Sequence, residues 1–160
     1  MKTLITQPIS AEAFEPFGQL LQAPAHTGRA YINDRLANER ADAVVSLSMT
    51  TVESTANTAL IATEMERHEF SSQSFIPLDV SRYLVVVAPH GANGRPDEQH
   101  MQAFVVPGHI GITYGVNVWH HSLRVLDRPA QFAVLMWKNE TATDEEFVPL
   151  SESTQIILQD

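Results

Sequence analysis

The stretch Ile112–Leu123 reads ITYGVNVWHHSL and gathers two histidines, an asparagine, a tryptophan and a tyrosine into one short, β-prone run. Successive side chains of an extended strand point to opposite faces, so the neighbours His120 and His121 cannot both enter one cavity. We expect one of them to face the chemistry and the other to be structural or exposed. Trp119 shares the face of His121, where packing is the commoner role of a tryptophan.

A second stretch, Glu64–Pro77, reads EMERHEFSSQSFIP and places acidic residues beside a histidine. On a strand, alternation puts Glu64, Glu66 and His68 on one face and sends Arg67 to the other. We interpret the two stretches as the two halves of an active site. Arg67 is the nearest cation to this cluster, and its place on the opposite face predicts a salt bridge behind the sheet or at a subunit contact.

Composition narrows the classes of partner. Ten Lys and Arg against 19 Asp and Glu give a formal net charge of -9 over 160 residues, which disfavours a surface that must neutralise phosphates. We therefore expect no nucleic-acid partner. The chain has no cysteine, which excludes disulfides, thiolate metal ligands and a cysteine nucleophile.

Membrane and secretion signals are also missing from the sequence. The longest apolar runs, Leu84–Pro89 and Phe132–Trp137, are far shorter than the roughly 20 residues that span a bilayer. The opening segment has no long apolar run of the kind found in signal peptides. We expect a cytoplasmic protein without a membrane partner.

Many short apolar segments separated by Gly, Pro, Asn or Asp predict a mainly β fold, either a sandwich or a barrel, as a single domain over residues 1–160. Ser10 should cap a short helix over residues 11–14. The alternation of residues 44–49 predicts a half-buried strand, and the tail at 155–159 an edge strand or a swapped arm. The other expected strands cover residues 4–9, 19–22, 60–67, 74–76, 83–88, 103–106, 110–114, 116–121, 122–126 and 132–137.

Imidazole and carboxylate groups together suit a borderline divalent metal ion. Glu66 and His68 would supply two ligands from one strand face, Gln73 would return from the next turn, and His120 would close the site from a partner strand. Spacing alone leaves open the alternative of a barrel interior with a hydrogen-bonded Glu and His and no metal. Glu64 lies one strand step earlier, at the expected barrel mouth, and we expect it to do no chemistry.

Other polar side chains are candidates for contacting a substrate. Asn117 lies where a turn could direct its amide toward a ligand, and Tyr114 and Tyr31 are candidate hydrogen-bond donors. Asn33, in the same YIN segment as Tyr31, is a further candidate. Tyrosine is also common at half-buried strand positions, so each of these residues has an equally ordinary structural role.

The motifs MERHEFSSQSFIPL at residues 65–78 and NVWHHSL at residues 117–123 resemble the ureidoglycolate lyase family. Weaker similarities, in the opening PISAEAFEPFGQLL, in YIN, in YLVVVAP and in AFVVPGHIGITYG, extend the resemblance to about Trp137. The resemblance implies a cupin-like β-barrel with a few short helices, a homodimer, and release of urea from ureidoglycolate to leave glyoxylate.

The resemblance also assigns positions to the cluster. Glu66, His68, Gln73 and His120 fall where cupins carry their metal ligands, although Glu66 replaces a histidine and Gln73 a glutamate. The family is associated with nickel, so either a divalent ion assists the reaction or the site works by acid-base chemistry alone.

Ureidoglycolate is a carbinolamine, and its cleavage needs a base for the hydroxyl proton and an acid for the leaving urea nitrogen. His68 or His120 could be the base, because an unperturbed imidazole titrates near neutral pH. Glu66 could orient an imidazole, or act as the base itself if burial raises its pKa. Arg67, Asn117 and Tyr114 are the candidates for holding the substrate carboxylate.

Three alternatives remain open from the sequence. One is a non-catalytic cupin-like protein that binds a small carboxylate. Another is a ureidoglycolate hydrolase that releases ammonia instead of urea. The third is a metal-dependent oxygenase or a sugar isomerase, since the fold alone does not select the chemistry.

Overall fold

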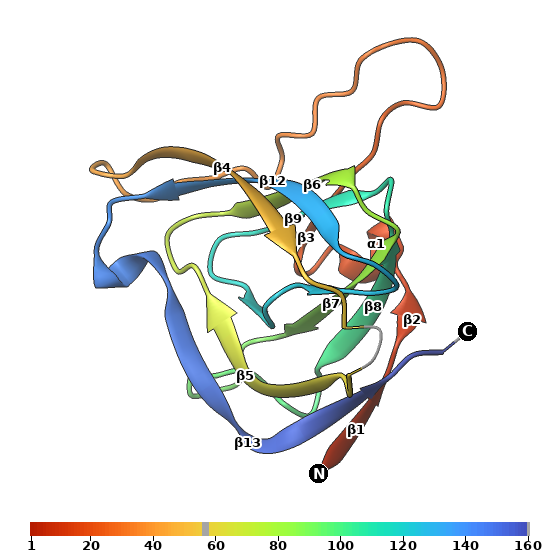
Figure 1. Ribbon diagram of the computed structural model, residues 1–160. Coiled ribbons are helices and arrows are strands. Elements are labelled where there is room, and N and C mark those ends of the chain that lie inside the picture. Colours follow the sequence, from red (N-terminus) through yellow and green to blue (C-terminus); the bar gives the residue numbers. More distant parts are fainter. Residues whose placement is uncertain (56–57, 160) are drawn as a thin grey trace.

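The computed structural model describes residues 1–55 and 58–159, which form strands, turns and one short α-helix at the side of the strands (Figure 1). The helix α1 (Ala11–Phe14) is capped by Ser10, whose hydroxyl accepts a hydrogen bond from the Ala13 N–H at 3.1 Å. A 3-10 helix, η1 (Ala142–Asp144), precedes the last strand. The mainly β class predicted from the sequence is confirmed.

The strands follow one another along the chain with short connections. They are β1 (Lys2–Ile5), β2 (Gln7–Pro8), β3 (Gly18–Leu21), β4 (Val44–Val52), β5 (Ile61–Arg67), β6 (Gln73–Asp79), β7 (Arg82–Ala88), β8 (Gln102–Pro107), β9 (Gly111–Tyr114), β10 (Trp119–His120), β11 (Arg124–Val125), β12 (Ala130–Lys138) and β13 (Glu146–Ile157).

Two sheets form the walls of a nearly closed barrel. The first has the strand order β1-β13-β5-β10-β7-β8-β2, with β11 also paired to β7, and the second has the order β3-β9-β6-β12-β4. In the first sheet β10 pairs with both β5 and β7, and His120 lies opposite Glu66. This pairing brings the two sequence motifs together.

Strand β7 is buried on both faces, which explains its continuous apolar run. Val85 packs with Phe104 and Phe132 in the core between the two sheets. Leu84 points the other way and packs with Trp119 in a second cluster, which includes side chains of β5 and β13. A strand covered on both sides needs apolar residues at every position rather than at alternate ones.

Strand β4 exposes its apolar side chains and directs polar ones toward the interior. The half-buried strand expected at residues 44–49 was wrong in its burial, because Val45, Leu47 and Met49 are 60 to 69% exposed. The alternate residues Ser46 and Ser48 point inward and line a cavity. The interior of the barrel is polar at this end, and the apolar side of the strand lies on the outside.

The expected strands at residues 4–9, 116–121 and 155–159 differ from the strands observed there. The segment 4–9 is divided into β1 and β2 at Thr6, whose N–H donates to the carbonyl of Ile157 at 2.9 Å. The segment 116–121 is shortened by a turn in which Asn117 has a φ of 64°. The tail is no edge strand, because β13 lies between β5 and β1.

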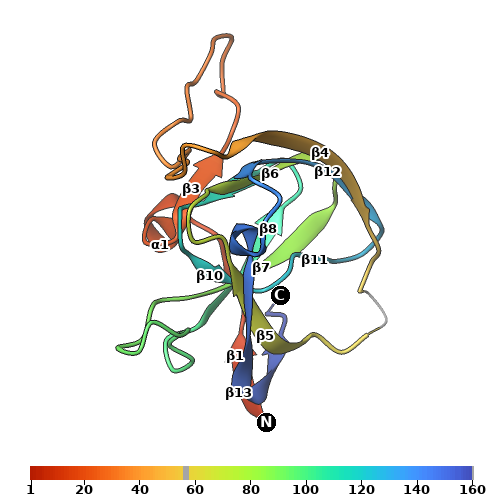
Figure 2. The same ribbon diagram turned by 90° about the vertical axis from the view of Figure 1, so that its left-hand side faces the viewer.

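The connection between β3 and β4, residues 22–43, projects beyond the second sheet, as Figures 1 and 2 both show. Its last residues return to the barrel and pair with the turn between β5 and β6 through Asn38 and Ser71. Within residues 1–55 and 58–159, no helix is long and apolar enough to span a bilayer.

Candidate active site

A cavity of about 690 Å³ opens between the two sheets, at the end where β5 finishes. Glu66 and His68 line it from the first sheet, and Gln73 lines it from the second. The connection between β12 and β13 closes one side of it with Glu140 and Asp144. The cavity is large enough for a small organic acid, and its wall is rich in polar groups.

Glu66, His68 and His120 form a triad at this cavity. Each offers one ligand atom, and these atoms all lie within 4.8 Å of one another. The two imidazole ring centroids are 5.4 Å apart. His120 is only 2% exposed and is not part of the cavity wall. It lies behind Glu66 and His68, which separate it from the cavity.

Backbone carbonyls fix the proton on each imidazole. His68 Nδ1 lies 2.9 Å from the carbonyl oxygen of Asp144, and His120 Nδ1 lies 3.0 Å from that of Val118. Because a carbonyl oxygen can only accept, each Nδ1 must donate a proton. In the neutral rings the lone pair is then on Nε2, and both Nε2 atoms are buried without a hydrogen-bond partner.

Burial and neighbouring groups shift the pKa values of His68 and Glu66. Burial lowers the pKa of His68, and the neighbouring His120 lowers it further, so His68 is neutral at neutral pH. Burial raises the pKa of Glu66, but its contacts with His120 and His68 outweigh this and lower the pKa overall. The carboxylate therefore stays ionised, and the raised pKa that a Glu66 base would need does not occur.

These residues fit a divalent metal ion. Two imidazoles and one carboxylate converge, a donor set that suits borderline divalent cations. Gln73 adds an amide oxygen that is buried without a hydrogen-bond partner and lies on the same cavity wall.

Tyr114 supports His120 instead of facing the cavity. Its ring stacks on the His120 ring with a centroid distance of 4.1 Å and an interplanar angle of 17°. Burial raises the pKa of Tyr114 well above 10, so its hydroxyl stays protonated. The residue does not line the cavity, and stacking is the role that this geometry favours.

Arg67 lies on the other face of β5, as alternation predicted. Its Nε donates to Glu146 Oε2 at 2.6 Å and its Nη1 to Asn117 Oδ1 at 2.8 Å, while the guanidinium lies 4.6 Å from the Trp119 ring centroid. Neither Arg67 nor Asn117 lines the cavity. The expected salt bridge behind the sheet is confirmed.

Asn117 has a structural contact at the end of β5. Its N–H donates a hydrogen bond to the carbonyl of His68 at 2.9 Å.

The remaining candidates lie apart from the triad. Tyr31 is 75% exposed on the projecting connection, and Asn33 is exposed on the same segment. Glu64 is exposed and is not part of the cavity wall. His121 is buried, and its Nδ1 donates to the carbonyl of Ser122 at 2.7 Å, so it is the structural member of the histidine pair.

The cavity wall contains a lysine that lies outside the expected strand at residues 132–137. Among the described residues of the cavity wall, Lys138 is the only Lys or Arg. Strand β12 continues to this residue, one beyond the expected end at Trp137. Period two along β12 points Val134, Met136 and Lys138 into the cavity, so extending the strand by one residue would have found the lysine.

Comparisons with known proteins agree with this geometry. The chain is 35% identical over 157 residues to a ureidoglycolate lyase of Mesorhizobium japonicum, covering 92% of this chain and 93% of that one. It is 29% identical over 178 residues to a ureidoglycolate lyase of Schizosaccharomyces pombe, covering 95% and 93% of the two chains.

A solved structure, a dTDP sugar isomerase of Desulfovibrio desulfuricans, matches with a TM-score of 0.52 over 84% of this chain and 83% of that one. The two sequences are 14% identical, so this likeness supports the cupin-like fold and nothing about the chemistry. The family model for ureidoglycolate lyase matches residues 1–157. With that match and the relatives above, the chain belongs to the ureidoglycolate lyase family.

Proposed function

We propose that this protein cleaves ureidoglycolate to glyoxylate and urea. Its membership of the family supports the proposal. The observation that carries it is the pair of buried Nε2 atoms of His68 and His120, neither with a hydrogen-bond partner, beside the ionised carboxylate of Glu66. Such an arrangement suits the removal and return of a single proton.

The reaction balances with one proton moved inside the site. A neutral imidazole takes the proton of the substrate hydroxyl at Nε2, the carbon–nitrogen bond breaks as the carbonyl of glyoxylate forms, and the leaving urea nitrogen takes up a proton. No water and no oxidant is consumed. Glu66 Oε1 lies 3.5 Å from His120 Nε2, close enough to stabilise a transient imidazolium.

A divalent cation such as Ni²⁺ would be held by Glu66, His68 and His120, with Gln73 beside them, and would supply Lewis acidity to the substrate hydroxyl. The orientation of both rings by backbone carbonyls serves either chemistry, because it leaves Nε2 free as a base or as a ligand.

The substrate carboxylate is assigned to Lys138. Arg67 was the first candidate for this role, but it is engaged with Glu146 outside the cavity. Lys138 lies on the cavity wall, and its Nζ has a 3.3 Å contact with Glu140, whose side chain is largely exposed. A lysine held so loosely can turn toward an anion that enters the cavity.

The test is turnover of ureidoglycolate by the purified protein, with glyoxylate, urea and ammonia all measured against the uncatalysed background. Equal amounts of glyoxylate and urea support the lyase. Ammonia in place of urea would support the hydrolase, and binding without turnover the small-carboxylate binding protein. The variants His68→Ala and His120→Ala should each lose roughly a hundredfold or more in turnover.

A homodimer and a cytoplasmic location belong to the same proposal. The outer side of β4 exposes Val45, Leu47 and Met49, and β6 exposes Ile76. Met49 and Ile76 both pair with the buried Ala133 of β12, so the exposed apolar side chains of β4 and β6 lie on the same outer face with one strand between them. Exposed apolar surface of this kind favours association, and sedimentation of the purified protein tests it.

A further inference from the structure

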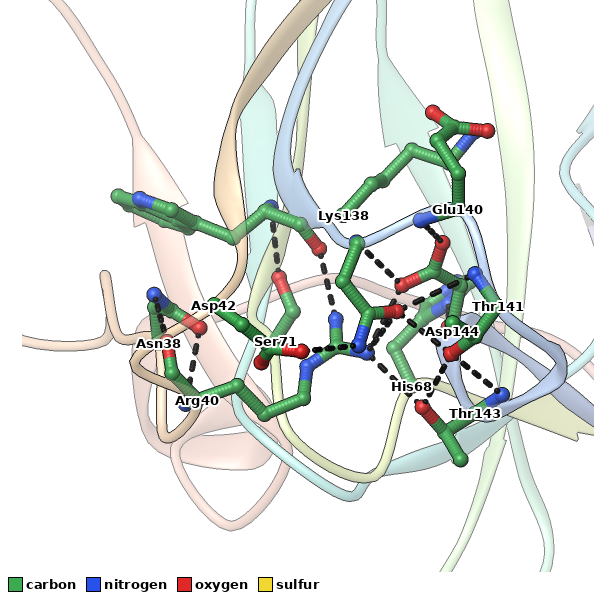
Figure 3. A network of polar contacts seen from close by, with 12 residues as sticks. Asn38, Arg40, Asp42, His68, Ser71, Lys138, Glu140, Thr141, Thr143 and Asp144 are labelled. Atoms are coloured by element: carbon green, nitrogen blue, oxygen red, sulfur yellow. Dashed lines mark hydrogen bonds and ion pairs between the residues drawn. The ribbon is translucent and has the colours of Figure 1, made fainter.

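An enclosed ion pair between Arg40 and Asp144 lies beside His68 (Figure 3). Arg40 Nη1 is 2.8 Å from Asp144 Oδ1, and the two side chains are only 10% and 9% exposed. Arg40 comes from the returning end of the β3–β4 connection, and Asp144 ends the 3-10 helix η1. The pair therefore joins two segments about 100 residues apart.

The carboxylate of Asp144 holds a tight turn. It accepts the N–H of Asn139 at 3.0 Å and the N–H of Glu140 at 2.8 Å. Glu140 has a φ of 60°, a left-handed conformation that costs roughly 1–2 kcal/mol for a residue with a Cβ. These bonds offset that cost, so the position of Asp144 depends on its side chain.

Arg40 forms hydrogen bonds to the same turn. Its Nη1 also donates to Asn139 Oδ1 at 3.0 Å and to Thr143 Oγ1 at 3.1 Å, and its Nη2 donates to the carbonyl of Trp137 at 3.2 Å. The preceding residue is fixed as well, because the Glu39 N–H donates to the carbonyl of Phe70 at 2.8 Å. Arg40 thus ties the β12–β13 connection to the turn that follows His68.

The main-chain carbonyl of Asp144 is the atom that reaches His68. It accepts the Nδ1–H at 2.9 Å, and no other hydrogen bond to the His68 ring is present among the described residues. If residues 139–144 moved away, the neutral ring would be free to carry its proton on Nε2. That tautomer has no lone pair on Nε2 with which to accept the substrate proton or bind a metal ion.

We propose that Arg40 and Asp144 are positioning residues that keep the proton of His68 on Nδ1 and its lone pair on Nε2. They act through the Asp144 carbonyl and do not touch the reacting atoms. The kinetic consequence rests on the proposed lyase function, whereas the tautomer of His68 can be measured without any turnover.

The experiment compares Asp144→Asn, Arg40→Ala and Arg40→Lys with the wild type. Asp144→Asn leaves the carbonyl that contacts His68 chemically unchanged, and Arg40→Ala leaves the cavity wall unchanged, so an effect shared by both variants reports the position of that carbonyl. Asp127→Asn is the control, because Asp127 pairs with Arg82 at 2.8 Å, a more exposed ion pair of the same residue types away from the cavity. Thermal unfolding establishes which variants fold.

Long-range ¹H–¹⁵N spectra of the metal-free protein identify the tautomer of His68. We expect Nδ1–H in the wild type and in Asp127→Asn, and a population of Nε2–H in Asp144→Asn and Arg40→Ala, partly reversed in Arg40→Lys. With ureidoglycolate, Asp144→Asn should lose roughly tenfold to a hundredfold in kcat, with KM little changed, and Ni²⁺ binding should weaken by a similar factor.

An unchanged His68 tautomer in folded Asp144→Asn overturns the inference, whatever happens to turnover. A shifted tautomer upholds it, even if the wild-type protein does not cleave ureidoglycolate. In that last case the proposed function fails while the positioning role stands.

Discussion

Replacing Lys138 by methionine should weaken substrate binding without slowing the chemical step. Methionine keeps much of the length of the side chain and removes its charge. At about 4 Å and an effective dielectric constant of about 20, an ammonium and a carboxylate attract each other by ~4 kcal/mol. The Lys138 side chain is 35% exposed, so desolvation and water screening reduce the net contribution to ~1.5 kcal/mol.

That energy corresponds to a rise in KM of about tenfold, since ~1.4 kcal/mol is one power of ten. The carboxylate is present in both ground and transition states, so kcat should stay within about twofold. The assay measures initial rates of glyoxylate release over a range of ureidoglycolate concentrations. Inhibition by the product glyoxylate, which keeps the same carboxylate, should weaken by a similar factor.

The control is Arg128→Met, which makes the same change in net charge at a surface pair with Asp79. Its KM should match that of the wild type. A Lys138→Met variant with an unchanged KM, or with a loss confined to kcat, would refute the assignment of the carboxylate to this lysine.

Three further outcomes are expected. The pKa of His68 lies below its ordinary 6.5 in the folded chain, so the unfolded chain binds the proton more readily. The melting temperature should therefore fall as the pH drops below about 6.5. The variant His68→Gln should show a weaker dependence of the melting temperature on pH. Leu47→Glu should convert dimers to monomers in sedimentation, whereas Ile157→Glu, on distant β13, should not. Phe132→Ala should cost about 3–5 kcal/mol in denaturant unfolding, because Phe132 is fully buried between the sheets; a loss below about 1 kcal/mol would contradict this.

Local patterns in the sequence were enough to predict the position of most strands and which neighbouring side chains share a face. Alternation along β5 separated Glu66 from Arg67, and the same rule showed that only one of His120 and His121 could face the site. These predictions are reliable because the geometry of one strand decides them. The strand pairing that brings His120 opposite Glu66 came only from the expectation that the two motifs meet.

The sequence failed where the environment of a strand decides its burial. The half-buried strand expected at residues 44–49 has its apolar side chains exposed, because nothing in Val45 or Ser46 tells whether the barrel interior is apolar or polar at that end. Arg40 and Asp144 gave no signal at all, since their pairing depends on two connections that fold against each other. Tyr31 was chosen for its residue type, and the structure leaves it exposed on a projecting segment.

The parallel pairing of β1 with β13, in which Lys2 lies opposite Thr154, has a consequence for how the protein is made. Strand β1 is synthesised about 150 residues before β13 and must wait, with that edge unpaired, until β13 leaves the ribosome. Closing so long a loop slows folding, and an exposed strand edge can meanwhile pair with another chain. Nascent chains stalled before residue 146 should therefore bind chaperones, and those released after residue 157 should escape them.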